Sequence, residues 1–272
     1  MPANSEKEAA YGVLDQRVVV DDLDRVAEQI SYLGYAVIES GYTATEIDDI
    51  RRILDETHLR YVERYGERAL KEIDEYNGIR LPLALDDAFL KLASNARIIE
   101  LVKKLIQNKF ILNQQNGVIN PPGKTYNQAL WHRDLPYQHF VSSKPLAINA
   151  LYCVDEFTTQ NGATFVLPSS HTQEAFPSDA YIESNAKQVE AAAGSFIVLD
   201  CMVFHRGGPN ITSVPRRAVN HVYTTAFIKQ QIDIPSALGN DRVLSPEMAE
   251  LLGFRYRIPR TVDEFLRSRR RE

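Results

Sequence analysis

The sequence predicts a mainly β domain, a sandwich or barrel of strands buttressed by helices. Three observations favour this class. Apolar residues in the first hundred positions recur every three or four residues, as on one face of a helix. Beyond position 110 the pattern changes to short apolar runs separated by turn residues. The total of 272 residues is a length that one large β domain with flanking helices can occupy.

We expect a single domain over residues 1–272, in four parts. Residues 1–20 show no strong pattern and are predicted to be a flexible arm. Residues 22–105 are predicted to be a mostly helical buttress, and residues 110–230 the β core. Residues 231–272 form a C-terminal extension, whose arginine-rich end we expect to be a solvated helix end rather than a binding patch.

The helical part is predicted from spacing and from capping residues. A helix that opens at Asp22 should end at Gly34, because glycine readily adopts the left-handed conformation that closes helices. A short strand is expected next, over residues 35–38. Thr45 is expected to cap the following helix with its hydroxyl. Residues 86–105 again show helical spacing and are expected to form two pieces.

The β core is predicted as five main strands with turn residues between them. Asn161-Gly162 is a hairpin-type turn signal. Helices followed by many strands favour a sandwich or barrel over an alternating α/β fold. The expected strands are residues 110–119, 146–154, 164–167, 195–199 and 217–227.

Composition excludes several classes of protein. The net charge of −5 gives no general attraction to nucleic acids or anionic membranes, so we expect neither as a partner. Cys153 and Cys201 lie in apolar runs and form no disulfide framework and no CxxC motif. No apolar run approaches the roughly 18 residues of a membrane span, and the polar N-terminus has no signal-peptide core. These features favour a cytoplasmic protein.

The first chemical signal is the triplet His132-Arg133-Asp134. Residues i and i+2 of an extended chain point the same way, so its imidazole and carboxylate can bind one metal ion. A second histidine from a distant strand would complete three ligands on one face. That arrangement suits non-haem iron(II), since the open positions must hold a bidentate co-substrate and dioxygen. The triplet alone is a weak signal, and a solvated turn is the alternative.

His205 and Arg216 extend the pattern. His205 is expected to end the strand over residues 196–200 and to open the glycine-rich loop 206–210. Arg216, eleven residues later, begins the next strand, where its planar guanidinium can hold the distal carboxylate of 2-oxoglutarate. The alternative is a surface salt bridge. Arg217 should point the opposite way and is expected at the surface.

Together these motifs resemble the phytanoyl-CoA dioxygenase family over roughly residues 28–230. The resemblance implies a double-stranded β-helix (jelly-roll, cupin-like) fold for the β core, with iron(II), 2-oxoglutarate and dioxygen. By position, His132, Asp134 and His205 match the iron ligands, and Arg216 matches the 2-oxoglutarate partner. The matching segments are Trp131–Leu135, Asp155–Thr158, Asn161–Thr164, Leu167–His171, His205–Asn210 and Pro215–Arg217.

Further positions are compared with the same family. Gln114 and Asn149 match places where members have polar co-substrate contacts, and an edge-strand polar group is the alternative for each. Thr164 is a weaker candidate. Ser169 replaces the glycine of the usual Pro-Gly-Ser-His, which predicts a slightly different turn but no lost ligand. Asp134 occupies the position that is a small residue in halogenating relatives, so the resemblance implies hydroxylation or a related oxidation.

The sequence therefore predicts an iron(II)- and 2-oxoglutarate-dependent dioxygenase of the hydroxylase type. It would oxidise a small organic substrate, such as a secondary metabolite, an amino acid or an acyl thioester, and release succinate and CO2. Two alternatives stay open, a zinc hydrolase with the same three ligands and a non-catalytic jelly-roll binding module. A homodimer is also left open. The residues expected to line the pocket or its lid are Tyr126, Asn127, Trp131, Tyr137, Gln138 and His139.

Overall fold

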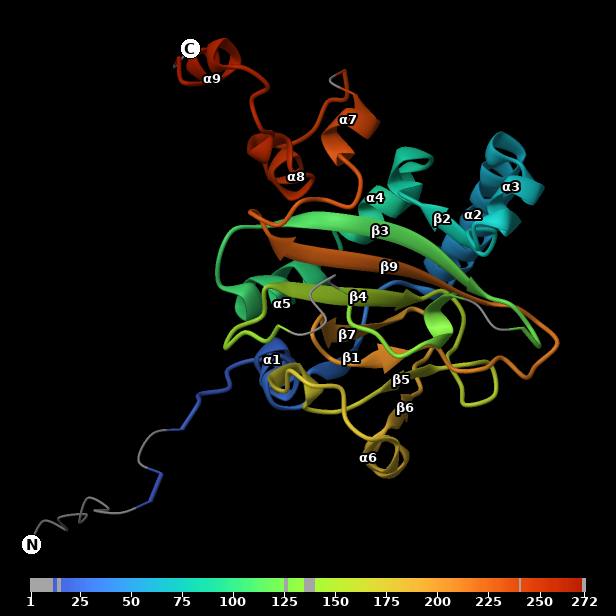
Figure 1. Cartoon of the computed structure of the whole chain (residues 1–272). Coiled ribbons are helices and arrows are strands. Elements are labelled where there is room, and N and C mark those ends of the chain that lie inside the picture. The colour runs from blue at the N-terminus through green and yellow to red at the C-terminus, as the bar shows by residue number, and fades with distance from the viewer. Residues whose placement is uncertain (1–11, 14–15, 125–126, 135–139, 240, 271–272) are drawn as a thin grey trace, which may run out of the picture.

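The computed structural model describes residues 12–13, 16–124, 127–134, 140–239 and 241–270. Most of the arm predicted over residues 1–20 lies outside these ranges. Within them, nine strands form two antiparallel sheets of six and three strands (Figure 1). The strands are β1 (Tyr35–Glu39), β2 (Gly78–Arg80), β3 (Phe110–Asn120), β4 (Ala147–Cys153), β5 (Thr164–Val166), β6 (Lys187–Val189), β7 (Ser195–Asp200), β8 (His205–Arg206) and β9 (Arg216–Thr225).

The larger sheet has the order β1-β7-β4-β9-β3-β2, and the smaller sheet has the order β6-β5-β8. An apolar cluster between the sheets includes Ile197 and Ala218 from the larger sheet and Val166 and Val189 from the smaller one. Two sheets that pack face to face in this way confirm the predicted jelly-roll fold with flanking helices. The described strands do not close into a barrel.

The N-terminal helices cover the other face of the larger sheet, whereas α6 lies beside the smaller sheet (Figure 1). One core cluster joins the N-terminal helices to β4, β7 and β9 through buried side chains such as Leu54, Leu101 and Tyr223. The C-terminal helices follow β9, and α8 contacts β3. The helices are α1 (Asp22–Leu33), α2 (Ala44–Tyr65), α3 (Glu67–Glu72), α4 (Asp87–Ala93), α5 (Ala96–Ile106), α6 (Asp179–Asn185), α7 (Ile234–Leu238), α8 (Pro246–Leu251) and α9 (Val262–Ser268).

Side chains of β9 alternate between the two layers. Val219 and Tyr223 join the core under the helices, whereas Ala218 joins the cluster between the sheets. By the same two-residue period, Arg216 points between the sheets and Arg217 points toward the helices. The alternation decides which polar side chains of this strand reach the interior, and so it determines which residues can belong to a site there.

Most predicted helix boundaries are confirmed, with one correction. The first helix spans Asp22–Leu33, and Gly34 closes it with a φ of 82°. The helical stretch after residue 86 is divided into α4 and α5. The cap of α2 is Thr43 and not Thr45, because Thr43 and Glu46 form a reciprocal capping box. Two threonines two residues apart make this start ambiguous from sequence.

Two expectations for the strands were wrong. Asn161-Gly162 does not make a hairpin, since β4 pairs with β7 and β9 while β5 pairs with β6 and β8. Gly162 instead allows a close approach between the segment before β5 and the segment after β8, where a Cβ atom would lie 2.5 Å from the carbonyl oxygen of Gly208. His205 does not end β7. It begins β8 in the smaller sheet, after a turn. Among the described helices, none combines the length and apolar character of a membrane span.

Candidate metal centre

The segment that contains His132 and Asp134 is held against the start of β8. The backbone N–H of each histidine, His132 and His205, donates to the carbonyl oxygen of the other at 3.0 Å. The Asp134 N–H donates to the carbonyl of Cys201 at 3.1 Å. This short antiparallel pairing brings two residues that are 73 positions apart side by side, with their ring centroids 4.4 Å apart.

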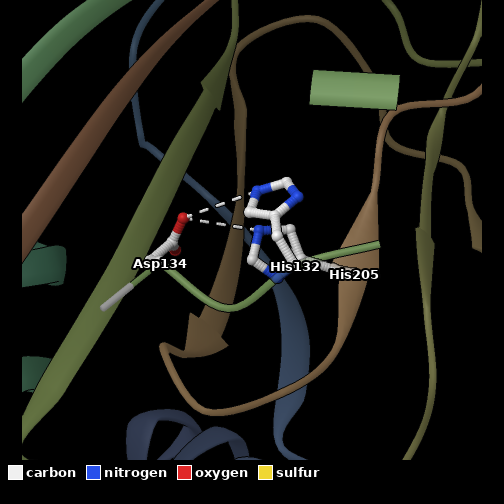
Figure 2. Close-up of side chains that lie close together, drawn as sticks. All are labelled: His132, Asp134 and His205. Carbon is white, nitrogen blue, oxygen red and sulfur yellow. Dashed lines mark ion pairs between the residues drawn. The ribbon is translucent and has the colours of Figure 1, made fainter. Parts of the chain in front are cut away.

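The three side chains converge on one point, as Figure 2 shows. Asp134 Oδ1 lies 3.5 Å from His205 Nε2 and 3.9 Å from His132 Nε2. Donor atoms at roughly 2.1 Å from a shared ion and at right angles to each other would be about 3 Å apart. The observed separations are slightly wider, and one donor atom from each residue lies within 4.8 Å of the others. The cluster can therefore bind one metal ion after a small contraction.

The tautomer of both histidines is set by backbone carbonyls. Nδ1 of His132 lies 2.7 Å from the carbonyl oxygen of Leu130, and Nδ1 of His205 lies 2.9 Å from that of Val203. A carbonyl only accepts, so each Nδ1 carries the proton. The lone pair of each Nε2 is then available and directed toward Asp134, which is how metal-binding histidines are oriented.

Asp134 is a buried carboxylate that stays ionised. Burial alone would raise its pKa, but the facing imidazoles of His205 and His132 and the Asn149 amide lower it to about 2. Burial also lowers the pKa of His132, and the neighbouring His205 adds to that effect. Burial opposes the protonation of His205 as well, yet the Asp134 carboxylate outweighs it and raises the pKa of His205. A compact negative charge between two imidazoles is suited to a divalent cation.

Asn149 and Arg216 lie beside the cluster, in one small cavity. Asn149 Nδ2 donates to Asp134 Oδ2 at 2.5 Å. Arg216 is 2% exposed, donates from Nη1 to the carbonyl of Gly162 at 2.5 Å, and lies 3.9 Å from the ring centroid of Phe157. The cavity, of about 40 Å³, is lined by the three candidate ligands together with Asn149, Leu151, Thr164, Leu199 and Arg216.

Gln114 is placed elsewhere. It lines an adjoining cavity of about 260 Å³ that reaches from the triad toward β2, and it does not border the cavity of Arg216. Trp131 does not line either cavity. Its ring packs 6.2 Å from that of Phe176 and beneath the guanidinium of Arg206. Tyr126, Tyr137, Gln138, His139 and the side chain of Asn127 lie outside the described residues.

Arg217 was expected at the surface, but its side chain is only partly exposed. Its Nε lies 2.6 Å from Asp55 Oδ1 and its Nη1 lies 3.1 Å from Asp155 Oδ2. Asp55 belongs to α2, so this arginine ties the larger sheet to a covering helix. The two adjacent arginines thus lie on opposite faces of β9, one between the sheets and one under the helices.

Arg133 is a supporting residue that sequence reasoning missed. Its side chain is 2% exposed, and its guanidinium donates to the carbonyls of Met202 at 2.6 Å and Ser170 at 3.0 Å and also to that of Gln173. The guanidinium carbon also lies 3.9 Å from the ring centroid of Phe204. Because Arg133 separates two candidate ligands, these bonds fix the segment that presents them.

Ser169 keeps the turn that a glycine would favour. Its φ of 63° and ψ of 3° are left-handed, a conformation that costs roughly 1–2 kcal/mol for a residue with a Cβ atom. Its hydroxyl donates to the carbonyl of Tyr32 at 2.9 Å, and its N–H donates to that of Leu33 at 2.8 Å. These bonds to α1 help to offset the strain, and no candidate ligand is displaced.

Known proteins resemble this chain in sequence and in fold. The sequence model of a family described as phytanoyl-CoA dioxygenase (PhyH) matches residues 32–218. An uncharacterised protein of Mycobacterium tuberculosis is 31% identical over 250 residues, which cover 89% of this chain and 91% of the relative. EctD of Sphingopyxis alaskensis, solved with bound Fe, superposes with a TM-score of 0.62 at 21% identity, over 79% of this chain and 82% of its own. The epimerase SnoN, solved with Fe3+, alpha-ketoglutarate and nogalamycin RO, gives a TM-score of 0.60 at 19% identity, over 82% of this chain and 93% of its own.

Proposed function

The chain belongs to the phytanoyl-CoA dioxygenase family, and we propose that it is an iron(II)- and 2-oxoglutarate-dependent dioxygenase acting on a small organic substrate. The observation that most directly supports this is the shared cavity of the triad and Arg216. Two imidazoles and one carboxylate face each other there, and a buried guanidinium lies in the same space.

The donor set fits iron(II). Two imidazole nitrogens and one carboxylate oxygen form the combination typical of non-haem iron oxygenases, which need further positions for a co-substrate and dioxygen. His132 and His205 would bind through Nε2, and Asp134 through Oδ1. When bound, iron(II) with 2-oxoglutarate and dioxygen supplies the oxidising chemistry, and 2-oxoglutarate leaves as succinate and CO2.

The chain's part in binding 2-oxoglutarate is assigned to Arg216. Its planar guanidinium can receive the distal carboxylate in a two-donor contact. Leu151 and Leu199 line the same cavity and can contact the methylene groups of the co-substrate. Among the described residues, Oδ1 of Asn149 has no hydrogen-bond partner, while Nδ2 donates to Asp134, so Asn149 can also contact the bound co-substrate. Gln114, in the adjoining cavity, is better placed for the substrate.

The outcome at the substrate is proposed to be hydroxylation. SnoN is an epimerase, so the fold alone does not select one oxidation. Asp134 occupies the position that a halide would need and is fixed there by Asn149. With that position filled by a carboxylate, halogenation is disfavoured, and hydroxylation or a related oxidation is the expected result.

The zinc-hydrolase alternative shares the three ligands but leaves Arg216 and its cavity without a function. A binding module would need none of the buried charges. The discriminating experiment incubates the full chain with iron(II), 2-oxoglutarate and 18O-labelled dioxygen. We expect succinate that carries one 18O atom. Absence of labelled succinate, with iron bound, would favour the alternatives.

A further inference from the structure

Carboxamides dominate the larger cavity beside the triad. Six of the described residues that line it have a side-chain amide, and they come from separate parts of the chain. Gln114 and Asn116 lie on β3, and Asn220 lies opposite Asn116 on β9. Neighbouring positions of one sheet face therefore present amides side by side. The six residues are Asn77, Gln114, Asn116, Gln128, Asn220 and Gln231.

Two of these amides have unused hydrogen-bonding capacity. The side chain of Asn116 is 93% buried (7% exposed), and its Oδ1 has no hydrogen-bond partner among the described residues. Oδ1 of Asn220 likewise has none there. Buried polar atoms without partners are unfavourable. They are uncommon in folded proteins except where a ligand or water supplies the missing hydrogen bond. Their position next to the triad indicates that a ligand does so here.

The charges around the cavity give an anion no net attraction. Asp74 and Glu75 line it, in addition to Asp134. Of the two arginines that line it, Arg80 is paired with Glu75 at 2.7 Å, and Arg133 donates to backbone carbonyls. Arg216 borders the smaller cavity instead. Beyond the triad, the described lining therefore has two carboxylates and two arginines, so the formal charges cancel, and both arginines already donate hydrogen bonds.

The cavity also offers little apolar surface. Its apolar lining among the described residues is limited to Gly78, Gly117 and Val118. An acyl chain would bury its methylene groups against amides and carboxylates, and this burial would contribute little favourable free energy. A volume of about 260 Å³ is small beside the roughly 300–1,000 Å³ of common ligand pockets. The occupant should therefore be compact and polar.

We infer that this cavity receives a neutral or cationic substrate with several hydroxyl or amino groups, of the sugar, cyclitol or amino-sugar class. The inference rests on the proposed function, since it assigns the substrate of that site. An amide both donates and accepts, which matches a hydroxyl group, and amide oxygens can also accept from an ammonium or amino group. Acyl thioesters and free fatty acids are excluded by the same lining.

The test uses the full chain, loaded without oxygen with iron(II) and 2-oxoglutarate. The probes are myo-inositol and glucosamine, compared with octanoate and octanoyl-CoA. We expect the first two to change the visible absorption of the complex and to raise its thermal midpoint. The inference fails if octanoate or octanoyl-CoA has these effects, and also if myo-inositol and glucosamine both leave spectrum and midpoint unchanged up to their solubility. If no visible band forms before any probe is added, the proposed function itself fails.

Variants locate the binding surface. Asn116→Leu should weaken binding of glucosamine about tenfold, because one amide that donates and accepts is lost. The affinity for 2-oxoglutarate should not change, since Asn116 does not line the cavity of Arg216. Asn116→Ser serves as the second variant if the leucine variant does not fold. Asn108→Leu, at an exposed loop position, is the matched control. Unchanged glucosamine affinity in a folded Asn116 variant would overturn the assignment.

Discussion

The side-chain amide of Asn149 donates a hydrogen bond to Oδ2 of Asp134 at 2.5 Å. Asn149 lies on β4 of the larger sheet, whereas Asp134 follows a short bridge to the smaller sheet. The bond therefore links the candidate metal ligand to the opposite layer of the fold. It leaves Oδ1 of Asp134 directed at the two histidines, so the carboxylate is oriented before any metal binds.

Asn149→Ala should weaken iron(II) binding by about 10- to 100-fold, the usual effect of removing a hydrogen bond that orients a ligand. The measurement is an anaerobic iron(II) titration against a competing chelator. Asn220→Ala is the control, because Asn220 faces the same interior but has no hydrogen bond to a candidate ligand among those described. Equal iron affinity in the two variants would show that Asp134 does not depend on Asn149.

Arg216→Ala and Arg217→Ala should separate two functions. Loss of a buried guanidinium that pairs with a carboxylate costs roughly 2–5 kcal/mol, so the first variant should bind 2-oxoglutarate on the order of 30- to several thousand-fold more weakly. The second should lose about 1 kcal/mol of stability, since its ion pairs to Asp55 and Asp155 are partly exposed. Titration calorimetry and urea unfolding measure the two effects. If Arg217→Ala weakened 2-oxoglutarate binding and Arg216→Ala did not, the two side chains would point in the opposite directions from those described.

Arg133→Met should affect both stability and metal binding. The variant keeps most of the side-chain volume but leaves the carbonyls of Met202 and Ser170 without their donor. Hydrogen bonds from a charged group contribute about 1.5–3 kcal/mol each, so the free energy of unfolding should fall by at least about 2 kcal/mol. Iron(II) affinity should fall too. If the folded variant binds iron(II) as the wild type does, Arg133 supports the fold and not the position of the ligands.

His221 should make the protein sensitive to acid. It is fully buried, its Nδ1 donates to the carbonyl of Ala150 at 3.0 Å, and its Nε2 lies 2.9 Å from Gln115 Nε2. Burial lowers the pKa of His221 from 6.5 to about 4. Between these values the unfolded chain binds a proton that the folded chain does not, so stability falls as pH falls.

The loss attributable to His221 amounts to about 3 kcal/mol between pH 6.5 and pH 4, at 1.36 kcal/mol per pKa unit. Urea unfolding at several pH values, compared between the wild type and His221→Gln, isolates this contribution because all other titrating groups are shared. The difference in stability between the two proteins should shrink or change sign on acidification. A difference that is constant across this range would mean that His221 titrates normally in the fold.

Sequence patterns predicted the parts of the site that local geometry determines. The i, i+2 spacing of His132 and Asp134 and the alternation at Arg216 and Arg217 are properties of extended backbone, so they could be inferred without a structure. His205 was expected beside His132 and Asp134 and lies there, but its predicted place at the end of β7 was wrong. Strand β8 spans His205–Arg206, too short for any periodic signal.

The supporting residues could not be predicted in the same way. The acceptors of Arg133 are backbone carbonyls from distant residues, and a carbonyl has no signature in the sequence. The amides of Asn116 and Asn220 meet only through the pairing of β3 with β9. Each alone is an ordinary polar residue on a strand. Their significance arises from the tertiary arrangement.

The central claim is that His132, Asp134 and His205 bind one iron(II) on which 2-oxoglutarate chelates. The most direct measurement is the visible spectrum of the full chain with iron(II), recorded without oxygen as 2-oxoglutarate is added. We predict a weak charge-transfer band that saturates at one iron per chain and is absent in folded His132→Ala, Asp134→Ala and His205→Ala variants. A wild-type protein that binds iron(II) but develops no band, or an alanine variant that keeps the full band, would contradict the claim.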